Sequence, residues 1–301
     1  MFLNAKFASC LLLLACLFAP EGHAEPVFRV LVVQSDNTLP YQTFTKALHF
    51  PAHFQIEILP RAEEFSAQPA DLVVTLGVRA TELLSGKTTL PVLAAMIPSA
   101  TALPAKQLRS RTLTAAFLDQ PPARQAAFVR AVLPERTRVG VLYFTDNRFD
   151  LAGFRAELSR QGGVLVKQNL RSDATLFEDL EAVLGESDVL LAVPDNAVYN
   201  GNTIRNILLS SYRRSIPLVG FSPSYVKAGA LCALYSTPEQ LAAQASAMII
   251  SFSVMGKLPE PQYPLFYSIA LNQEVARTLG LTLTSVEMIR LQVEKMSGST
   301  R

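Results

Sequence analysis

The sequence contains few of the residues on which catalysis, metal binding and disulfide bonding depend. Its 301 residues include no Trp, three His and three Cys. Cys10 and Cys16 lie in an apolar N-terminal stretch, so Cys232 stands alone in the rest of the chain. One Cys cannot form an intramolecular disulfide, and no Cys-x-x-Cys pair is present for zinc or redox chemistry. We therefore expect no cofactor and no bound metal.

Sequence motifs of enzymes are missing as well. The segment 220–224, Gly-Phe-Ser-Pro-Ser, lacks the second Gly of a nucleophile elbow, and no His follows it to act as a base. There is no glycine-rich loop of the phosphate-binding or dinucleotide-binding type. His49 and His53 are four residues apart, but Pro51 breaks the helix that would align them on a metal. The sequence predicts a protein that is not an enzyme.

Charge of either sign is sparse. The chain has 27 Lys and Arg against 25 Asp and Glu, and charged residues make up 17% of it. An average soluble domain has roughly 25%. There is no basic block, so we expect no binding to nucleic acid. Half of the residues are apolar, which excludes intrinsic disorder and provides for one large domain or two of ordinary size.

The first 24 residues have the pattern of a secretory signal peptide. Lys6 precedes an apolar run, 7–18, that is too short to span a bilayer. Gly22 and Ala24 then supply the small residues of a cleavage site. The sequence predicts export to the periplasm with removal of residues 1–24. A second pattern, Leu-Leu-Ala-Cys ending at Cys16, resembles a lipoprotein cleavage box, so lipid anchoring at Cys16 is the alternative.

The remaining chain consists of two similar halves. Short Val/Leu/Ile-rich runs alternate with amphipathic segments, as in parallel strands that helices cover on both faces. The predicted strands are 27–34, 54–59, 71–76, 91–97 and 112–118 in the first half, and 138–144, 164–170, 188–193, 217–221 and 231–235 in the second. Such repeated units predict an α/β fold of two Rossmann-like, doubly wound lobes.

We place the boundaries of these lobes from the helices and the prolines. The first lobe is expected at 25–120, and the second at 121–236, beginning with a helix from Pro121 to Leu133. Residues 237–301 do not form a third unit. They begin with a helix from Pro238 to Met255, continue through a Pro-rich linker and an extended segment, 266–271, and are expected to cross between the lobes through a hinge.

Polar residues gather where the predicted strands end. In doubly wound sheets, ligands bind beyond the carboxyl ends of the strands. The dipeptide Asp-Asn follows three strands, and Tyr41 and other aromatic residues lie close by. The candidate ligand-binding residues are Ser35, Asp36, Asn37, Gly77, Val78, Ser99, Thr145, Asp146, Asn147, Asp195, Asn196, Tyr199, Ser222 and Tyr225. Each Asp or Asn could instead cap the helix that follows it. As a set, they predict a small-molecule site in a cleft between the lobes.

Several segments of the second half resemble a known family. They are Leu133-Pro134 leading into 138–143, then 193–198, 216–220 and 225–231, and finally Asn272, Ala276 and 279–281. In their order and spacing they resemble the ABC-type substrate-binding proteins of the tryptophan/tyrosine-binding family. The first lobe departs from the family, because residues 37–40 replace its usual His-Pro pair.

The resemblance implies a type I periplasmic binding fold, in which two lobes joined by a hinge hold a ligand between them. It implies a monomeric component that delivers a small organic ligand to an ABC permease in the inner membrane. Asp195 stands at the position of an Asp in the family's second lobe, where its carboxylate would accept hydrogen bonds from an amine. Helix N-termini near Ser35 and Ser99 would receive a carboxylate. The ligand hypothesis is therefore an amino acid or a related zwitterion.

Two other functions fit part of these observations. A periplasmic sensor that reports its ligand to a membrane receptor would have the same fold and the same kind of site. A two-domain enzyme of the glycosyltransferase type would have two similar lobes. The export signal and the missing catalytic residues count against that enzyme.

Overall fold

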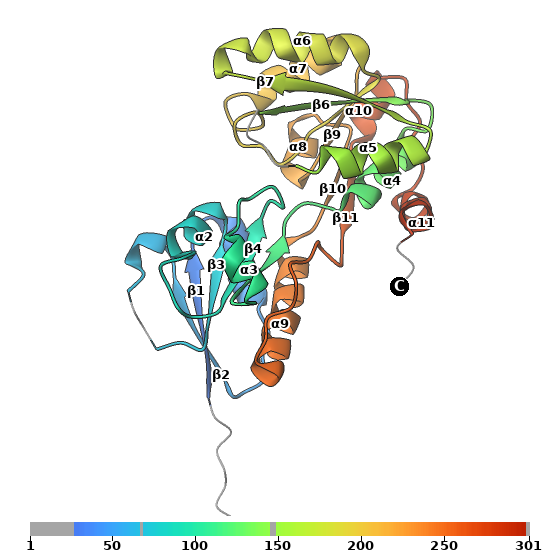
Figure 1. Ribbon diagram of the computed structural model, residues 1–301. Helices are drawn as coiled ribbons and strands as arrows, with labels where there is room; N and C mark the ends of the chain where they lie inside the picture. Colours follow the sequence, from blue (N-terminus) through green and yellow to red (C-terminus); the bar gives the residue numbers. More distant parts are fainter. Residues whose placement is uncertain (1–26, 67–68, 145–148, 299–301) are drawn as a thin grey trace, which may run out of the picture.

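The protein forms two α/β lobes, which lie one above the other in Figure 1. The structure is a computed structural model, and it describes residues 27–66, 69–144 and 149–298. The predicted signal peptide, with Cys10, Cys16 and the cleavage site at Ala24, lies outside these ranges. Thr145, Asp146 and Asn147 lie outside them as well.

The first lobe is built on a five-stranded parallel sheet with the strand order β2-β1-β3-β4-β5. The strands are β1 (Phe28–Gln34), β2 (Phe54–Leu59), β3 (Leu72–Leu76), β4 (Val92–Ile97) and β5 (Leu113–Phe117). Its own helices are α1 (Leu39–Ala47), η1 (Ala62–Glu64), α2 (Val78–Leu84) and α3 (Ala105–Arg109). Each strand falls within the apolar run that predicted it. The prediction of a doubly wound α/β lobe in this half of the chain is therefore confirmed.

Apolar side chains at successive strand positions are buried on opposite faces of this sheet. Val30 and Val32 of β1 belong to the core beneath α1 and α9. Leu31 and Val33 belong to the core beneath α2 and α3. Because both faces are covered, the strand has no polar alternation, and a continuous apolar run results.

The second lobe contains a six-stranded sheet with the order β11-β10-β9-β8-β6-β7. Five strands are parallel, and β11 runs antiparallel to β10 at the edge. The strands are β6 (Arg138–Phe144), β7 (Val164–Leu170), β8 (Val189–Leu191), β9 (Leu218–Gly220), β10 (Cys232–Tyr235) and β11 (Ser268–Leu271). The helices are α4 (Pro122–Val132), α5 (Leu151–Arg160), η2 (Asp173–Thr175), α6 (Leu176–Glu186), α7 (Ile204–Arg213), α8 (Pro223–Ala228), α10 (Gln273–Thr278) and α11 (Val286–Ser297).

The chain returns to the first lobe through α9 (Pro238–Met255), whose first turn has a capping box between Thr237 and Gln240. Leu241, Ile249 and other apolar residues of this helix complete the core of the first lobe. Gln262 then pairs with β5, after which β11 joins the sheet of the second lobe. In the described residues, no helix is long and apolar enough to span a membrane.

Three crossover segments, 118–121, 236–237 and 263–267, therefore connect the lobes. One hydrogen-bond chain ties them together. Gln120 Nε2 donates to Ser236 Oγ (2.9 Å), and Ser236 Oγ donates to the carbonyl oxygen of Phe266 (2.6 Å). Both side chains in this chain are buried. The crossover segments thus form one bonded unit at the junction of the lobes.

Candidate functional site

The strand ends of the first lobe face the second lobe in Figure 1, where β1 points upward. Ser35 follows β1, and its Oγ accepts a hydrogen bond from Ala80 N of α2 (2.9 Å). Gly77 follows β3 with φ of +86°, and a Cβ there would collide with Tyr41 Oη. Burial raises the pKa of Tyr41, as does the charge of Asp36, whereas a hydrogen bond with Ser35 lowers it. The predicted residues Ser35 and Gly77 are thus brought together, under a tyrosine.

The other predicted residues of this lobe make local contacts. Asp36 is exposed, and its Oδ1 accepts from Thr38 N (3.2 Å). Asn37 is exposed too, and its Oδ1 accepts from Gln42 Nε2 (3.0 Å). Val78 is half-buried and packs into the core beneath α2. These bonds are those of a turn and the start of a helix, and they leave the exposed Asp36 and Asn37 accessible.

A second polar group of the first lobe centres on Asp119. Ser99 follows β4 and donates twice to this carboxylate, from its N to Oδ1 (2.6 Å) and from its Oγ to Oδ2 (2.5 Å). Burial raises the pKa of Asp119 above its usual value, although the Ser99 hydrogen bonds oppose the shift. Of these residues, sequence reasoning identified Ser99 alone.

Tyr263 completes this group from a crossover segment. Its ring packs on Phe117 at the end of β5, with centroids 5.4 Å apart. Burial raises the pKa of the Tyr263 hydroxyl; a hydrogen bond with Ser99 lowers it, and the charges of Asp119 and Asp150 raise it. Asp150 is the N-cap of α5, so it belongs to the second lobe. Tyr263 therefore lies where acidic groups from both lobes act on it.

Asp195 ties two loops of the second lobe together. Its Oδ2 accepts from Phe144 N at the end of β6 (2.8 Å), and its Oδ1 accepts from Ala197 N (3.0 Å). The residue is 7% exposed. The sequence suggested that Asp195 could cap a following helix, but α7 starts only at Ile204, so Asp195 does not begin a helix. Asp195 instead stabilises the turn that follows β8, and neighbouring Asn196 is exposed.

The two predicted tyrosines of the second lobe differ in exposure. Tyr199 is 3% exposed and belongs to the core. Tyr225 of α8 is half-buried and packs against Phe221, with ring centroids 4.6 Å apart. Burial raises the pKa of both hydroxyls, that of Tyr225 to about 12. Ser222 is the N-cap of α8 and shares a hydrogen bond with Ser224. Tyr225 is thus partly accessible to solvent, and Tyr199 is not.

The predicted residues therefore form two sets, one in each lobe. Within the described residues, the hydrogen bonds given above connect each predicted residue to partners in its own half of the molecule. The residues that approach both lobes are those around Tyr263. Sequence reasoning missed Asp119, Asp150 and Tyr263, although Asp119 directly follows a predicted strand, which was the available signal.

The described residues contain no group of three or more His, Cys, Asp or Glu that could hold a metal ion. Cys232 is fully buried in β10, and burial raises the pKa of its thiol, which keeps it protonated and unreactive. The polar groups at the strand ends are hydroxyls, amides and carboxylates. This arrangement can bind a polar molecule through hydrogen bonds.

Comparison with known proteins gives a family match over most of the chain. A family model described as ABC transporter substrate binding protein matches residues 52–284. No curated protein matches the sequence.

Solved structures with the same fold have low sequence identity. One is an ABC domain from Streptococcus pneumonia in complex with L-Trp: identity is 17%, the match covers 88% of this chain and 98% of that one, and the TM-score is 0.64. Another is a ligand-free, open substrate-binding protein with adhesive properties from Clostridium difficile, with 16% identity, coverage of 87% and 97%, and a TM-score of 0.67. A periplasmic solute-binding protein from Actinobacillus succinogenes with bound D-allose has 10% identity, coverage of 83% and 99%, and a TM-score of 0.53. These likenesses confirm the type I periplasmic binding fold.

Proposed function

This chain belongs to the family of ABC transporter substrate-binding proteins, and we propose that it is the exported solute-binding component of an importer. Proteins of this family bind small molecules and do not convert them, in agreement with the missing catalytic motifs. In the proposed role, the chain holds one small organic ligand between its lobes in the periplasm. It then delivers the ligand to a permease in the inner membrane.

The observation that carries the proposal is the convergence of polar groups on the crossover segments. Ser99 and Asp119 come from the first lobe, Asp150 from the second, and Tyr263 from the connection between them. A ligand that contacts such groups would interact differently with open and closed arrangements of the lobes. Binding would therefore favour closure, since a ligand shifts an equilibrium only by its differential affinity for the two states.

We favour an amino acid as the ligand. The polar residues around Tyr263 include two carboxylates, which suit an ammonium group, and a carboxylate forms strong charge-assisted hydrogen bonds with amines. The exposed side chain of Asn37 is available for a ligand carboxylate. Among the structural neighbours, one was solved with L-Trp, which supports this class, and another with D-allose, which represents the competing class.

Native mass spectrometry of the exported protein tests the proposal directly. Ligand that stays bound through purification should appear as one small molecule per chain, and calorimetry with that molecule should show a single site. Calorimetry with a panel of amino acids, with D-allose as the competing solute, then tests the ligand class. Binding of the sugar alone would contradict the amino acid and leave the solute-binding role intact.

Small-angle scattering tests closure. The radius of gyration should decrease at saturating ligand, because the three crossover segments allow the lobes to move as rigid bodies. An unchanged radius with confirmed binding would contradict closure.

Export is tested by N-terminal sequencing of the protein from the periplasmic fraction. A chain that begins at Glu25 would support cleavage after Ala24, and a lipid-modified Cys16 would replace this prediction with membrane anchoring.

A further inference from the structure

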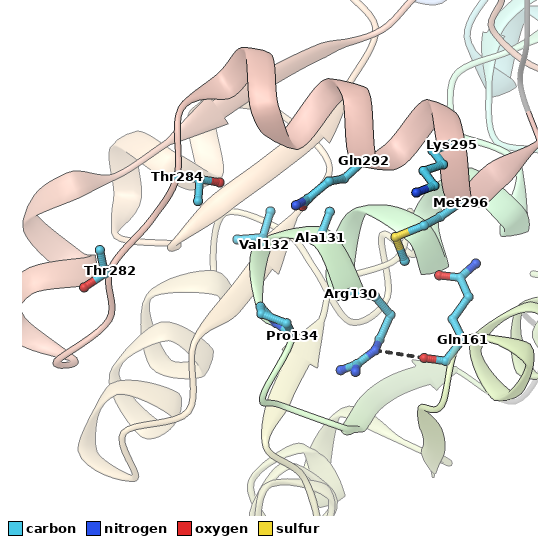
Figure 2. Close-up of a pocket in the computed structure, with 10 residues that line it drawn as sticks. All are labelled: Arg130, Ala131, Val132, Pro134, Gln161, Thr282, Thr284, Gln292, Lys295 and Met296. Atoms are coloured by element: carbon cyan, nitrogen blue, oxygen red, sulfur yellow. Dashed lines mark hydrogen bonds between the residues drawn. The ribbon is translucent and has the colours of Figure 1, made fainter.

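A cavity of about 470 Å³ opens between α4 and α11 in the second lobe. Its lining contains none of the residues discussed above as ligand-binding candidates. Figure 2 shows side chains of α11 above it and the end of α4 below it. Its size is within the range of small-molecule sites. The lining residues are Arg130, Ala131, Val132, Pro134, Gln161, Thr282, Thr284, Gln292, Lys295 and Met296.

The charge of this cavity has one sign. Arg130 and Lys295 are its ionisable residues, and no Asp or Glu lines it. Arg130 is held in place by the carbonyl oxygens of Gln161 (3.2 Å) and Arg136 (2.8 Å), which fixes the guanidinium at the cavity. Lys295 is exposed and extends from the last turn of α11. A fixed and a movable cation together attract an anion.

The rest of the lining is of two kinds. Val132, Pro134 and Met296 provide an apolar wall, and Met296 can adjust its shape because its side chain is flexible. The amide of Gln161 is buried, and neither its Nε2 nor its Oε1 has a hydrogen-bond partner. A buried amide without partners costs free energy, which a ligand that reached it would recover. Thr282 and Thr284 add hydroxyls at the opposite end (Figure 2).

We propose that this cavity is a second binding site, separate from the one between the lobes, for a small organic carboxylate with an apolar body. The carboxylate would pair with Lys295 and Arg130, and the apolar body would lie against Val132, Pro134 and Met296. A bare inorganic anion would leave the apolar wall unused, and a neutral apolar molecule would leave both cations unpaired. The combination therefore favours an amphipathic anion.

Methyl NMR of the methionines in the full exported chain tests this proposal, with benzoate as the probe and benzyl alcohol as its neutral counterpart. The Met296 methyl signal, assigned with Met296→Leu, should shift saturably with benzoate. The Met248 signal should stay in place, because Met248 lies in the core of the first lobe. Benzyl alcohol should bind about 25-fold more weakly, because it lacks the charge interactions with both Lys295 and Arg130, each of which contributes about fivefold.

Three variants sharpen the result. Lys295→Gln should weaken benzoate binding about fivefold. Lys227→Gln on α8 removes the same positive charge outside the cavity and should not alter the affinity for benzoate. Gln292→Trp should abolish binding by filling the cavity from an exposed helix position. A Met296 signal that benzoate does not move would overturn the site. Equal binding of benzyl alcohol, or an unchanged affinity in Lys295→Gln, would overturn its assignment to anions.

Discussion

The two lobes each bury a carboxylate beyond the carboxyl end of their sheet, but they use it differently. In the second lobe, Asp195 accepts hydrogen bonds from backbone N–H groups on two loops, at Phe144 and Ala197. In the first lobe, Asp119 accepts two hydrogen bonds from Ser99, beside Tyr263. Asp195 therefore holds a loop in place, whereas Asp119 belongs to the side-chain cluster that we propose contacts the ligand.

A second pair of features distinguishes the lobes. Each lobe packs a tyrosine over a glycine near a strand end: Tyr41 over Gly77, and Tyr225 over Gly220. Glycine is required at position 77 for two reasons: its φ is positive, and a Cβ there would collide with Tyr41. Gly220 is required for space, because a Cβ there would lie 2.6 Å from the Cβ of Tyr225.

The largest effect is expected for Asp195→Ala. The substitution leaves two backbone N–H groups unpaired in a site that is 7% exposed, so the free energy of unfolding should fall by about 3 kcal/mol. Chemical denaturation measures the change. Asp36→Ala is the control, because this exposed carboxylate accepts one turn hydrogen bond, and it should cost about 0.5 kcal/mol. If Asp195→Ala kept full stability but lost ligand binding, Asp195 would be a ligand group.

Gly77→Ala should destabilise the first lobe by about 2–3 kcal/mol, because the new Cβ adds a collision with Tyr41 to the strain of a positive φ. Gly86→Ala separates the two causes. Gly86 has φ of +84°, but a Cβ there meets nothing within 4 Å, so the loss should be about 1 kcal/mol. Thermal or urea unfolding compares the two. Equal losses would show that Tyr41 does not restrict the site.

Ser236→Ala tests the connection between the lobes. It removes the hydroxyl that links Gln120 to Phe266, and the expected loss in unfolding free energy is about 1–2 kcal/mol. Ser253→Ala in α9 is the matched control, since its hydroxyl bonds only to Ile250 O of the same helix. The free energy of unfolding of both variants is measured with urea. Equal losses in Ser236→Ala and Ser253→Ala would contradict the proposed link between the lobes.

The smallest expected effect is a pH dependence of the free energy of unfolding, which should have opposite signs for one carboxylate in each lobe. The pKa of Asp119 is raised in the folded state by burial, so the wild type loses stability as pH rises from about 4 through that raised pKa. Asp119→Asn lacks this loss, and its unfolding free energy minus that of the wild type should increase with pH over the same window.

Asp188 in the second lobe provides the opposite case. Burial raises its pKa, but hydrogen bonds from Arg138 and Thr137 outweigh burial, and the net pKa is lowered. Its stabilisation is present above the unfolded pKa and is lost as pH falls through the folded one. The deficit of Asp188→Asn should therefore be largest near neutral pH and vanish in acid. Urea unfolding across pH would refute the contrast if both differences followed the same slope.

The sequence predicted the sheets closely, and it placed several polar residues at strand ends, where the structure has them. All ten predicted strands are present, because a strand buried on both faces has an unbroken apolar run. Ser35, Gly77 and Ser99 could be placed near strand ends because a strand ends where its apolar run stops. Tyr263 could not be found in this way, since it follows no strand and reaches Ser99 only after the chain has passed through the whole second lobe.

Local residue patterns alone determined that this chain alternates strands and helices in two lobes. The spacing of apolar residues along the chain indicates each type of element, and it involves only residues close together in sequence. Only the tertiary structure decided that β11 adds an antiparallel edge, that α9 completes the first lobe, and that the charges of Asp119 and Asp150 both act on Tyr263. These contacts join residues far apart along the chain. Their formation depends on how the crossover segments fold back between the lobes, which no local pattern specifies.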